Sequence, residues 1–301
     1  MEGVDASAAK ISARLVTDFE PGIVMRELTG VSPRCGAGQS CVIPKVYWTT
    51  LAIMCGRFAL SKLPAELIDE FEIHTGKSLS KLPILPENWN VTPTQDIYIV
   101  RNDQSNVRDL AVTSWGLIAP WAKDATEALR SQSQAINARS ETVDQKPTFK
   151  SAFRSRRCLI PVDGYYEWAT ELGPFAPKQP FYIKSREWEP SRKSLALAGI
   201  WDRWIDPDGV VKESAAIITR PAVDFLATVH RRMPTLLPVD RWDRWLDNSL
   251  RDVDEIKSLM ELSEPAKNLV AIPVSSAVNK TANNGIELTF EVPLGEPTTL
   301  F

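Results

Sequence analysis

The fold class follows most directly from one continuous segment, CLIPVDGYYEW at Cys158–Trp168. Its apolar first half, Cys158–Val162, predicts a strand, and Asp163-Gly164 interrupts the apolar run before the aromatic half. If Tyr166 and Trp168 pack inward, the period of two turns Glu167 to the opposite face. A carboxyl group between aromatic rings has a raised pKa and can act as a general acid. An isolated D-G-x-x-E pattern is also typical of a surface glutamate on an aromatic hairpin.

Similar runs on both sides of this segment predict further strands, at Ile97–Arg101, Leu110–Trp115, Phe181–Lys184, Leu195–Ile200, Ala215–Thr219 and Leu269–Val274. Short helices are expected at Pro64–Phe71, with Ser61 as the N-cap, and at Val223–Val229, Trp242–Leu246 and Val253–Leu262. Strands and helices do not alternate regularly. The pattern therefore predicts an α+β fold, a mostly antiparallel β single domain with a few peripheral helices.

Composition narrows the function class. The 301 residues are 44% hydrophobic and carry a net charge of −3, so any nucleic-acid site must be a local basic groove. Four cysteines form no C-x-x-C pair and there are two histidines, which argues against a structural zinc site, and we expect no cofactor. Scattered cysteines suit a reducing, cytoplasmic compartment, nucleoid-associated in a bacterium. No apolar run is long enough to span a membrane, and a monomer is the default.

Residues 1–53 differ from the rest of the chain. Their charges cancel, their apolar residues follow no sustained period, and Gly36–Ser40 is loop-like. We expect this segment to be a disordered extension, a mis-assigned start or a removable leader, with residues 54–301 forming the catalytic domain.

The sequence Met54-Cys55-Gly56-Arg57-Phe58 reads like the beginning of a protein, although 53 residues precede it. A first-residue cysteine carries a free α-amine and a thiol on one carbon, and this pair condenses with an aldehyde to an imine and then a thiazolidine. An internal cysteine cannot react in this way because its nitrogen is an amide. The functional interpretation therefore depends on where the working chain begins.

Three other segments carry candidate functional residues. His230, in H-R-R-M-P, suits proton transfer near neutral pH, or is a helix-capping histidine before two solvated arginines. Asn137 and Arg139 share a face of a strand and suit ligand and phosphate binding, or belong to a surface Arg–Glu pair. The aromatic residues Trp115 and Trp121 can stack on bases, or form a packed corner.

Taken together and in order, these motifs resemble the SRAP family, which includes abasic-site processing proteins. The resemblance runs from M-C-G-R-F at Met54–Phe58 through W-N-V-T-P, W-G-L-I-A-P-W, I-N-A-R-S-E-T, C-L-I-P-V-D-G-Y-Y-E-W and H-R-R-M-P to the N-N-G at Asn283–Gly285. Each motif alone is weak, and their joint order is highly specific. The resemblance spans residues 54 to about 290.

The resemblance implies an enzyme that binds single-stranded DNA containing an abasic site and cross-links to the sugar aldehyde. It implies that Cys55 forms the Schiff base and then the thiazolidine, that Glu167 is the acid/base carboxylate, and that His230 assists ring opening and reversal. It further implies that Asn137 orients the adduct and that Arg57 and Arg139 contact phosphates, with Trp115 and Trp121 in the DNA-facing segment.

Two other functions stay open at this point. The second hypothesis is a cysteine-type peptidase that uses the same Cys55, Glu167 and His230 and acts on its own leader or on other proteins. Lyase cleavage at the abasic site belongs to the cross-linking hypothesis, because it would start from the same Schiff base. A non-catalytic single-stranded DNA-binding module is the third hypothesis, and it predicts salt-sensitive binding without a covalent product.

Overall fold

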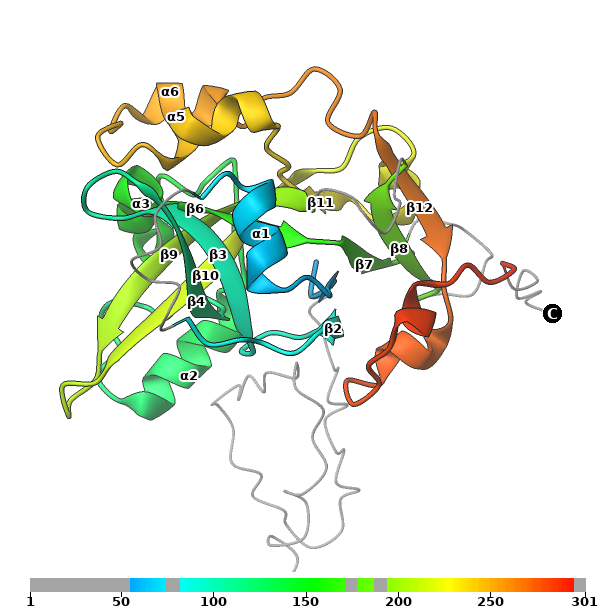
Figure 1. Cartoon of the computed structure of the whole chain (residues 1–301), viewed down its shortest axis with the longest axis horizontal. Helices are drawn as coiled ribbons and strands as arrows, with labels where there is room; N and C mark the ends of the chain where they lie inside the picture. The colour runs from blue at the N-terminus through cyan, green and yellow to red at the C-terminus, as the bar shows by residue number, and fades with distance from the viewer. Residues whose placement is uncertain (1–54, 74–81, 171–177, 187–193, 295–301) are drawn as a thin grey trace, which may run out of the picture. The chain divides into compact units, whose positions relative to one another are not determined.

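The structure, a computed structural model, describes residues 55–73, 82–170, 178–186 and 194–294 (Figure 1). The expectation for residues 1–53 lies outside the described residues. Within them, two sheets and several short helices form the α+β, mainly antiparallel architecture that the strand pattern predicts. None of the described helices is long and apolar enough to cross a membrane.

The larger sheet closes into a small barrel. Its strands are β3 (Asp96–Asn102), β4 (Arg108–Trp115), β6 (Arg157–Val162), β9 (Leu195–Ile205) and β10 (Val211–Pro221). They pair in the order β10-β4-β3-β6-β9, and β9 pairs with β10 again, which closes the ring. Only the β10–β4 contact within the ring is parallel. All five strands contribute buried side chains to the main core, among them Ile99, Leu110, Leu159, Leu197 and Ile217.

Beyond the closed ring, β10 carries one short strand on each edge. The strand β5 (Asn137–Arg139) continues the edge of β4 and runs parallel to β10, with Ile217 opposite Asn137. The strand β11 (Arg232–Pro234) continues the edge of β9 and is antiparallel, with Thr219 opposite Pro234. Two predicted site segments therefore flank the same end of β10.

The smaller sheet is antiparallel throughout. Its order is β12-β8-β7-β1-β2, with bounds β1 Arg57–Leu60, β2 Asn88–Val91, β7 Gly164–Trp168, β8 Pro180–Ser185 and β12 Leu269–Pro273. Gly164 is required where β7 and β8 meet, because a Cβ there would lie 2.5 Å from the Tyr182 ring and 2.7 Å from the Ile183 carbonyl oxygen. Two 3₁₀ turns, η3 (Ser276–Asn279) and η4 (Ile286–Thr289), follow β12.

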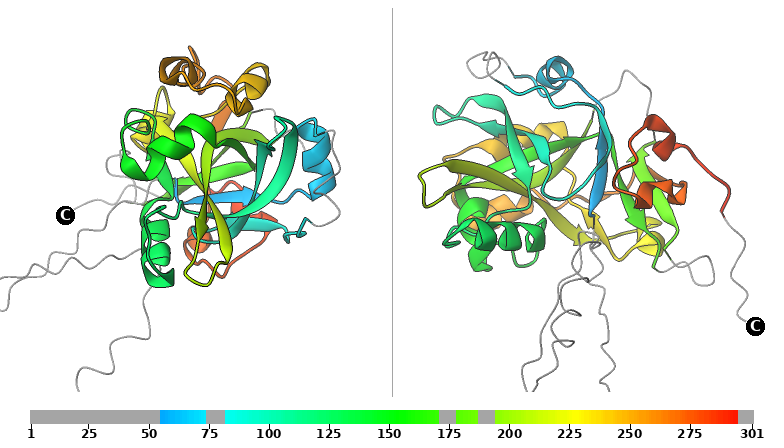
Figure 2. Two further views of the ribbon diagram at one scale, coloured as in Figure 1. Left: turned by 90° about the vertical axis from the view of Figure 1, so that its left-hand side faces the viewer. Right: turned by 90° about the horizontal axis from the view of Figure 1, so that it is seen from below.

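The helices are short and peripheral. Their bounds are α1 Pro64–Glu70, α2 Ala125–Gln134, α3 Pro147–Ser155, α4 Leu226–Val229, α5 Trp242–Leu246 and α6 Val253–Ser258, with a 3₁₀ turn η2 at Val239–Arg241. Helices α5 and α6 lie together at one end of the barrel (Figures 1 and 2). There the Trp245 indole donates to the Cys158 carbonyl.

The predicted strands are confirmed, and β9 and β10 extend further than their apolar cores suggested. The helices α4 and α6 are shorter than expected, and α2 and α3 were not predicted. The N-cap prediction was wrong. Leu63 holds the cap position of α1, and its backbone N–H donates to the Glu66 carboxylate. Pro64 is the first residue of the helix. Ser61 instead donates to the Asp163 carboxylate.

Strand β7 positions the site because both of its faces are buried. Tyr165 joins the main core, whereas Tyr166 packs with Tyr182 in a second cluster that Trp168 also contacts. The period of two therefore turns Glu167 away from Tyr166 and Trp168, as the sequence predicts. Glu167 is nevertheless only 3% exposed, so the surface-hairpin interpretation was wrong.

Candidate active site

Cys55 and Glu167 meet across the pairing of β1 with β7. Arg57 lies opposite Tyr166, which brings the residue two positions before Arg57 beside the end of β7. The backbone nitrogen and the Sγ atom of Cys55 both donate to Oε1 of Glu167, each at 2.7 Å. Cys55 is 2% exposed, so this contact is shielded from solvent. One carboxylate oxygen thus lies within hydrogen-bond distance of both the nitrogen and the sulfur of Cys55, the two atoms that would condense with an aldehyde.

Burial governs the protonation of this pair. It raises the pKa of Glu167 to about 7, although the hydrogen bonds from the Cys55 thiol and backbone oppose the shift. Burial also raises the pKa of the Cys55 thiol well above its usual value, and the neighbouring Glu167 charge adds to this. A carboxyl group poised near neutrality beside a protonated thiol suits transfer of a proton in either direction.

His230 completes a cluster with these two residues. It follows α4 as the C-cap residue, is buried, and places Nδ1 3.8 Å from Oε1 of Glu167. The backbone N–H of Arg232 donates to the same Nδ1 at 3.2 Å. The structure therefore brings together Cys55, Glu167 and His230, which are 63 or more residues apart in sequence.

The expectation of two solvated arginines after His230 was half wrong. Arg231 is exposed, whereas Arg232 is buried and pairs with Glu141. Glu141 therefore pairs with Arg232 and not with Arg139, the surface partner that the sequence suggested, and its own side chain stays partly exposed. Asn137 is half-buried on β5 and Arg139 is exposed at its end, on the edge of β10 opposite β11.

The two tryptophans proposed as DNA-facing differ. Trp115 is completely buried: its ring centroid lies 5.0 Å from that of Phe58, and its indole N–H donates to the Ile136 carbonyl. This ring belongs to the core, where a large aromatic side chain contributes most to the hydrophobic stabilisation of the fold. Because it is completely buried, it is not available to stack on a base. Trp121 is 55% exposed and keeps its surface available.

Arg57, predicted to contact phosphates, is engaged with its own chain. Its guanidinium donates to Oδ1 of Asn90 at 2.9 Å and to the Val278 carbonyl at 2.7 Å. The Asn90 amide in turn donates to the carbonyls of Val278, Lys280 and Asn283. These contacts hold the segment after β12 against β1 and β2, close to Cys55, which precedes β1.

Sequence reasoning missed Asn90, Glu141 and Arg232, although a signal was present for Arg232. Period-two spacing links His230 to Arg232, and side chains at i and i+2 of an extended chain share a face. Glu141 lies in the turn after β5, so its spacing from Arg139 does not place its side chain.

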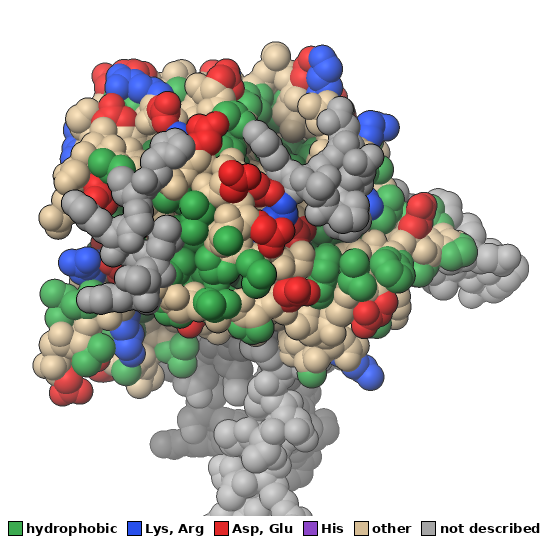
Figure 3. Space-filling view, viewed as in Figure 1, with side chains coloured by type: hydrophobic (Ala, Val, Ile, Leu, Met, Phe, Trp, Pro, Cys, Tyr) green, Lys and Arg blue, Asp and Glu red, His purple; other side chains and the backbone are tan. Residues whose placement is uncertain are grey.

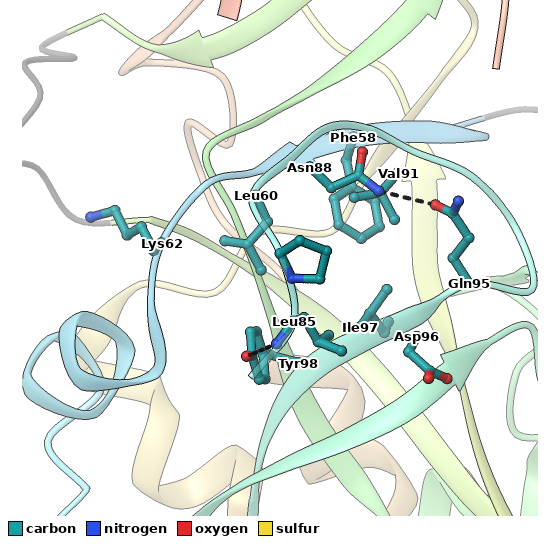
Figure 4. Close-up of a pocket in the computed structure, with 11 residues that line it drawn as sticks. Phe58, Leu60, Lys62, Leu85, Asn88, Val91, Gln95, Asp96, Ile97 and Tyr98 are labelled. Carbon is teal, nitrogen blue, oxygen red and sulfur yellow. Dashed lines mark hydrogen bonds between the residues drawn. The ribbon is translucent and has the colours of Figure 1, made fainter. Parts of the chain in front are cut away.

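A separate hollow of about 280 Å³ lies among β1, β2 and β3 (Figure 4). Phe58, Leu60, Val91 and Ile97 line its apolar side, and an Asn88–Gln95 hydrogen bond crosses its rim. No predicted catalytic residue lines it. Among the described residues, no group of three or more His, Cys, Asp or Glu side chains could hold a metal ion.

Comparison with known proteins identifies the family of this chain. The family model described as SOS response associated peptidase (SRAP) matches residues 54–281. The abasic site processing protein YoqW of Bacillus subtilis is 37% identical over 240 residues, which cover 78% of this chain and 98% of the relative. The abasic site processing protein HMCES of Gallus gallus is 31% identical over 218 residues, covering 66% of this chain and 62% of the relative.

A crystal structure of a protein from Bacteroides thetaiotaomicron shares the fold, with a TM-score of 0.69 at 25% identity, covering 79% of this chain and 100% of that one. The resemblance that the motifs suggested is therefore confirmed. This chain belongs to the SRAP family, among whose members are abasic site processing proteins.

Proposed function

We propose that the protein binds single-stranded DNA at an abasic site and joins it covalently through a thiazolidine formed by Cys55. One observation carries the proposal: the nitrogen and the sulfur of Cys55 both donate to a single oxygen of Glu167. That arrangement serves a reaction in which both atoms bond to the same carbon. The substrate is supported by the abasic-site processing relatives.

The reaction balances with these groups alone. The Cys55 α-amine attacks C1′ of the open-chain sugar aldehyde, and loss of one water leaves an imine. The Sγ atom then adds to the same carbon, while the thiol proton passes to the former imine nitrogen. Because Oε1 of Glu167 lies 2.7 Å from both atoms, it can accept this proton from sulfur and return it to nitrogen.

The proposal requires a free amine at Cys55. In the 301-residue chain this nitrogen belongs to the Met54–Cys55 peptide bond. We infer that the working form begins at Cys55, through synthesis from Met54 with removal of that methionine, or through removal of the longer leader. The amide already occupies the place that the amine would take beside Glu167.

For the DNA strand we propose contacts with Arg139 and Trp121, which are exposed, whereas Arg57 acts mainly by holding the segment at Val278. The face shown in Figure 3 is a poor match for a phosphate backbone, since acidic side chains gather near its centre among apolar ones. Proton transfer by His230, next to Glu167, would assist opening of the sugar ring and reversal of the adduct.

The peptidase alternative is weaker on physical grounds. A cysteine peptidase attacks with a thiolate, so its active thiol needs a lowered pKa. Here burial raises the pKa of the Cys55 thiol. In the cross-linking reaction the amine attacks first, and the thiol adds while still able to deliver its proton. The imine could also lead to β-elimination and strand cleavage, which would appear as a shortened oligonucleotide.

Intact mass spectrometry tests the proposal. The full chain and a chain beginning at Cys55 are each incubated with a single-stranded oligonucleotide carrying one abasic site. The chain beginning at Cys55 should gain the oligonucleotide mass minus one water, and the full chain should gain nothing. Borohydride reduction of the aldehyde, acetylation of the α-amine, or Cys55→Ser should each remove the stable adduct. Absence of any adduct with the chain beginning at Cys55 would overturn the proposal.

A further inference from the structure

We propose that Glu141 is a positioning residue for His230: through Arg232 it holds the backbone group that keeps the neutral imidazole protonated on Nε2. The inference deepens the proposed function and rests on it only for its catalytic consequence. Its structural part concerns which ring nitrogen of His230 faces Glu167, and that can be tested without DNA.

The starting observation is an ion pair beside the active site, between the buried Arg232 and the partly exposed Glu141. Both terminal nitrogens of the Arg232 guanidinium donate to the Glu141 carboxylate, one of them at 2.9 Å, and the same side chain donates to the Thr219 carbonyl at 2.7 Å. Thr219 lies on β10 and is completely buried. Glu141 thus ties the segment after β5 to β11 across the end of β10.

The pairing of β11 with β10 explains why this tie reaches His230. The Ala222 N–H donates to the Arg231 carbonyl, and the Thr235 N–H donates to the Ile218 carbonyl. In an antiparallel ladder bonded pairs alternate with non-bonded ones, and Arg232 opposite Pro221 is therefore in a non-bonded pair. The backbone N–H and C=O of Arg232 consequently point away from β10, so the ladder does not satisfy them.

His230 meets these two outward-pointing groups. Its Nδ1 lies 3.2 Å from the Arg232 nitrogen and 3.3 Å from the Arg232 carbonyl oxygen. A neutral ring with its proton on Nε2 accepts at Nδ1 from the N–H, which is the shorter of the two contacts. A protonated ring can instead donate from Nδ1 to the carbonyl. One backbone residue therefore serves both protonation states of the histidine.

This choice of nitrogen matters because Nδ1 is also the atom 3.8 Å from Oε1 of Glu167. With Nδ1 unprotonated, the ring can take up a proton on the side that faces the carboxyl group. The other tautomer would present an N–H there and could only donate. Since the ladder does not hold the Arg232 N–H, its place depends on the side chain, and Glu141 supplies the charged half of that anchor.

Nitrogen-15 NMR of the full 301-residue chain tests the tautomer directly. The chain contains two histidines, so the His230 ring signals are assigned by their loss in His230→Gln. In the neutral His230 ring of the wild type, the proton is expected on Nε2. In Glu141→Ala the Nδ1 and Nε2 shifts should move toward each other as the tautomers mix. Glu264→Ala, which removes an exposed pair with Lys267, is the matched control and should leave them unchanged.

Single-turnover cross-linking by the form that begins at Cys55 supplies the second measurement. Glu141→Ala should lower the maximal rate about tenfold while the half-saturating DNA concentration changes less than twofold, and Glu141→Gln, which keeps the shape and one acceptor, should recover part of the rate. Unaltered histidine shifts in Glu141→Ala would overturn the inference, as would an equal loss in DNA binding. If no variant or wild type cross-links DNA, the NMR result still decides the tautomer, and only the proposed function falls.

Discussion

Arg157 and Glu167 are both buried ionisable groups, but they differ in their hydrogen-bond partners and in their charge state near neutral pH. Arg157, at the start of β6, is 2% exposed and donates to four backbone carbonyls, those of Phe153, Trp245, Asp247 and Leu250. Glu167, on β7, accepts from Cys55 and still has its pKa raised to about 7. The first group stays charged at neutral pH, whereas the second lies near the point of losing its charge.

The difference separates a structural charge from a chemical one. Burial lowers the pKa of the Arg157 guanidinium to about 10, which leaves it protonated at neutral pH, and its donors close the ends of two helical segments. Ionising the buried Glu167 costs the folded state free energy, and this cost raises its pKa to about 7 beside the thiol and the backbone nitrogen of Cys55. The structural role and the proposed catalytic role therefore fall on different buried charges.

The largest expected effect is on the structural side. Arg157→Met should lower the free energy of unfolding by about 3 kcal/mol, because four buried carbonyls lose their donor. Urea denaturation at pH 7 measures this change. Arg154→Met, on the exposed face of helix α3 shortly before Arg157, is the matched control and should change stability by less than about 0.5 kcal/mol. A loss of less than about 1 kcal/mol in the free energy of unfolding of Arg157→Met would contradict the structural role of this charge.

Replacing Glu167 should have the opposite effect on stability: it should raise the free energy of unfolding above pH 7. The pKa of Glu167 in the folded protein lies above its usual 4.5, so the native state binds more protons between pH 4.5 and 7, and wild-type stability falls as pH rises through that window. Glu167→Gln lacks this dependence. It should match the wild type near pH 4 and exceed it by about 3 kcal/mol at pH 8. Denaturation across pH measures the difference, with the exposed Glu261→Gln as control; equal curves would contradict it.

The same variant should lose reaction rate. Glu167→Gln should slow cross-linking by the chain beginning at Cys55 about 100-fold at pH 7.5, because the thiol proton loses its acceptor. Below pH 7 the wild-type rate should fall more steeply than that of the variant, by one factor of proton concentration. Quenched single-turnover reactions read by gel give both slopes. Parallel profiles would show that Glu167 does not titrate in this step.

The smallest effects should separate the two tryptophans. Trp115→Phe should destabilise the protein by about 1–2 kcal/mol through the lost bond to the Ile136 carbonyl and the vacated volume, with single-stranded DNA affinity unchanged. Trp121→Ala should do the reverse, leaving stability unchanged and weakening binding about tenfold if its ring stacks on a base. Fluorescence anisotropy with an intact oligonucleotide measures affinity. Weaker binding by Trp115→Phe alone would return that residue to the DNA surface.

Local pattern was enough for much of the fold. Apolar runs located β3, β4, β6, β8 and β12 within one or two residues. In β3, β6 and β8 the run is continuous because both faces of the strand are buried. Strand β5 and the helix α2 carry no comparable signal: β5 is three residues long and held by its pairing with β10, and α2 is polar on most of its surface. Such elements are specified by their neighbours rather than by their own composition.

The candidate site divides in the same way. The identities of Cys55, Glu167 and His230, and the opposition of Glu167 to Tyr166 and Trp168, follow from residue chemistry and the two-residue period of a strand. Their meeting does not, because it depends on the pairing of β1 with β7 and on where α4 ends. Nor does the sequence distinguish Trp115 from Trp121, or reveal that Arg232 is buried against Glu141. Burial and long-range pairing are properties of the folded chain, since contacts between distant residues set them and local propensity does not.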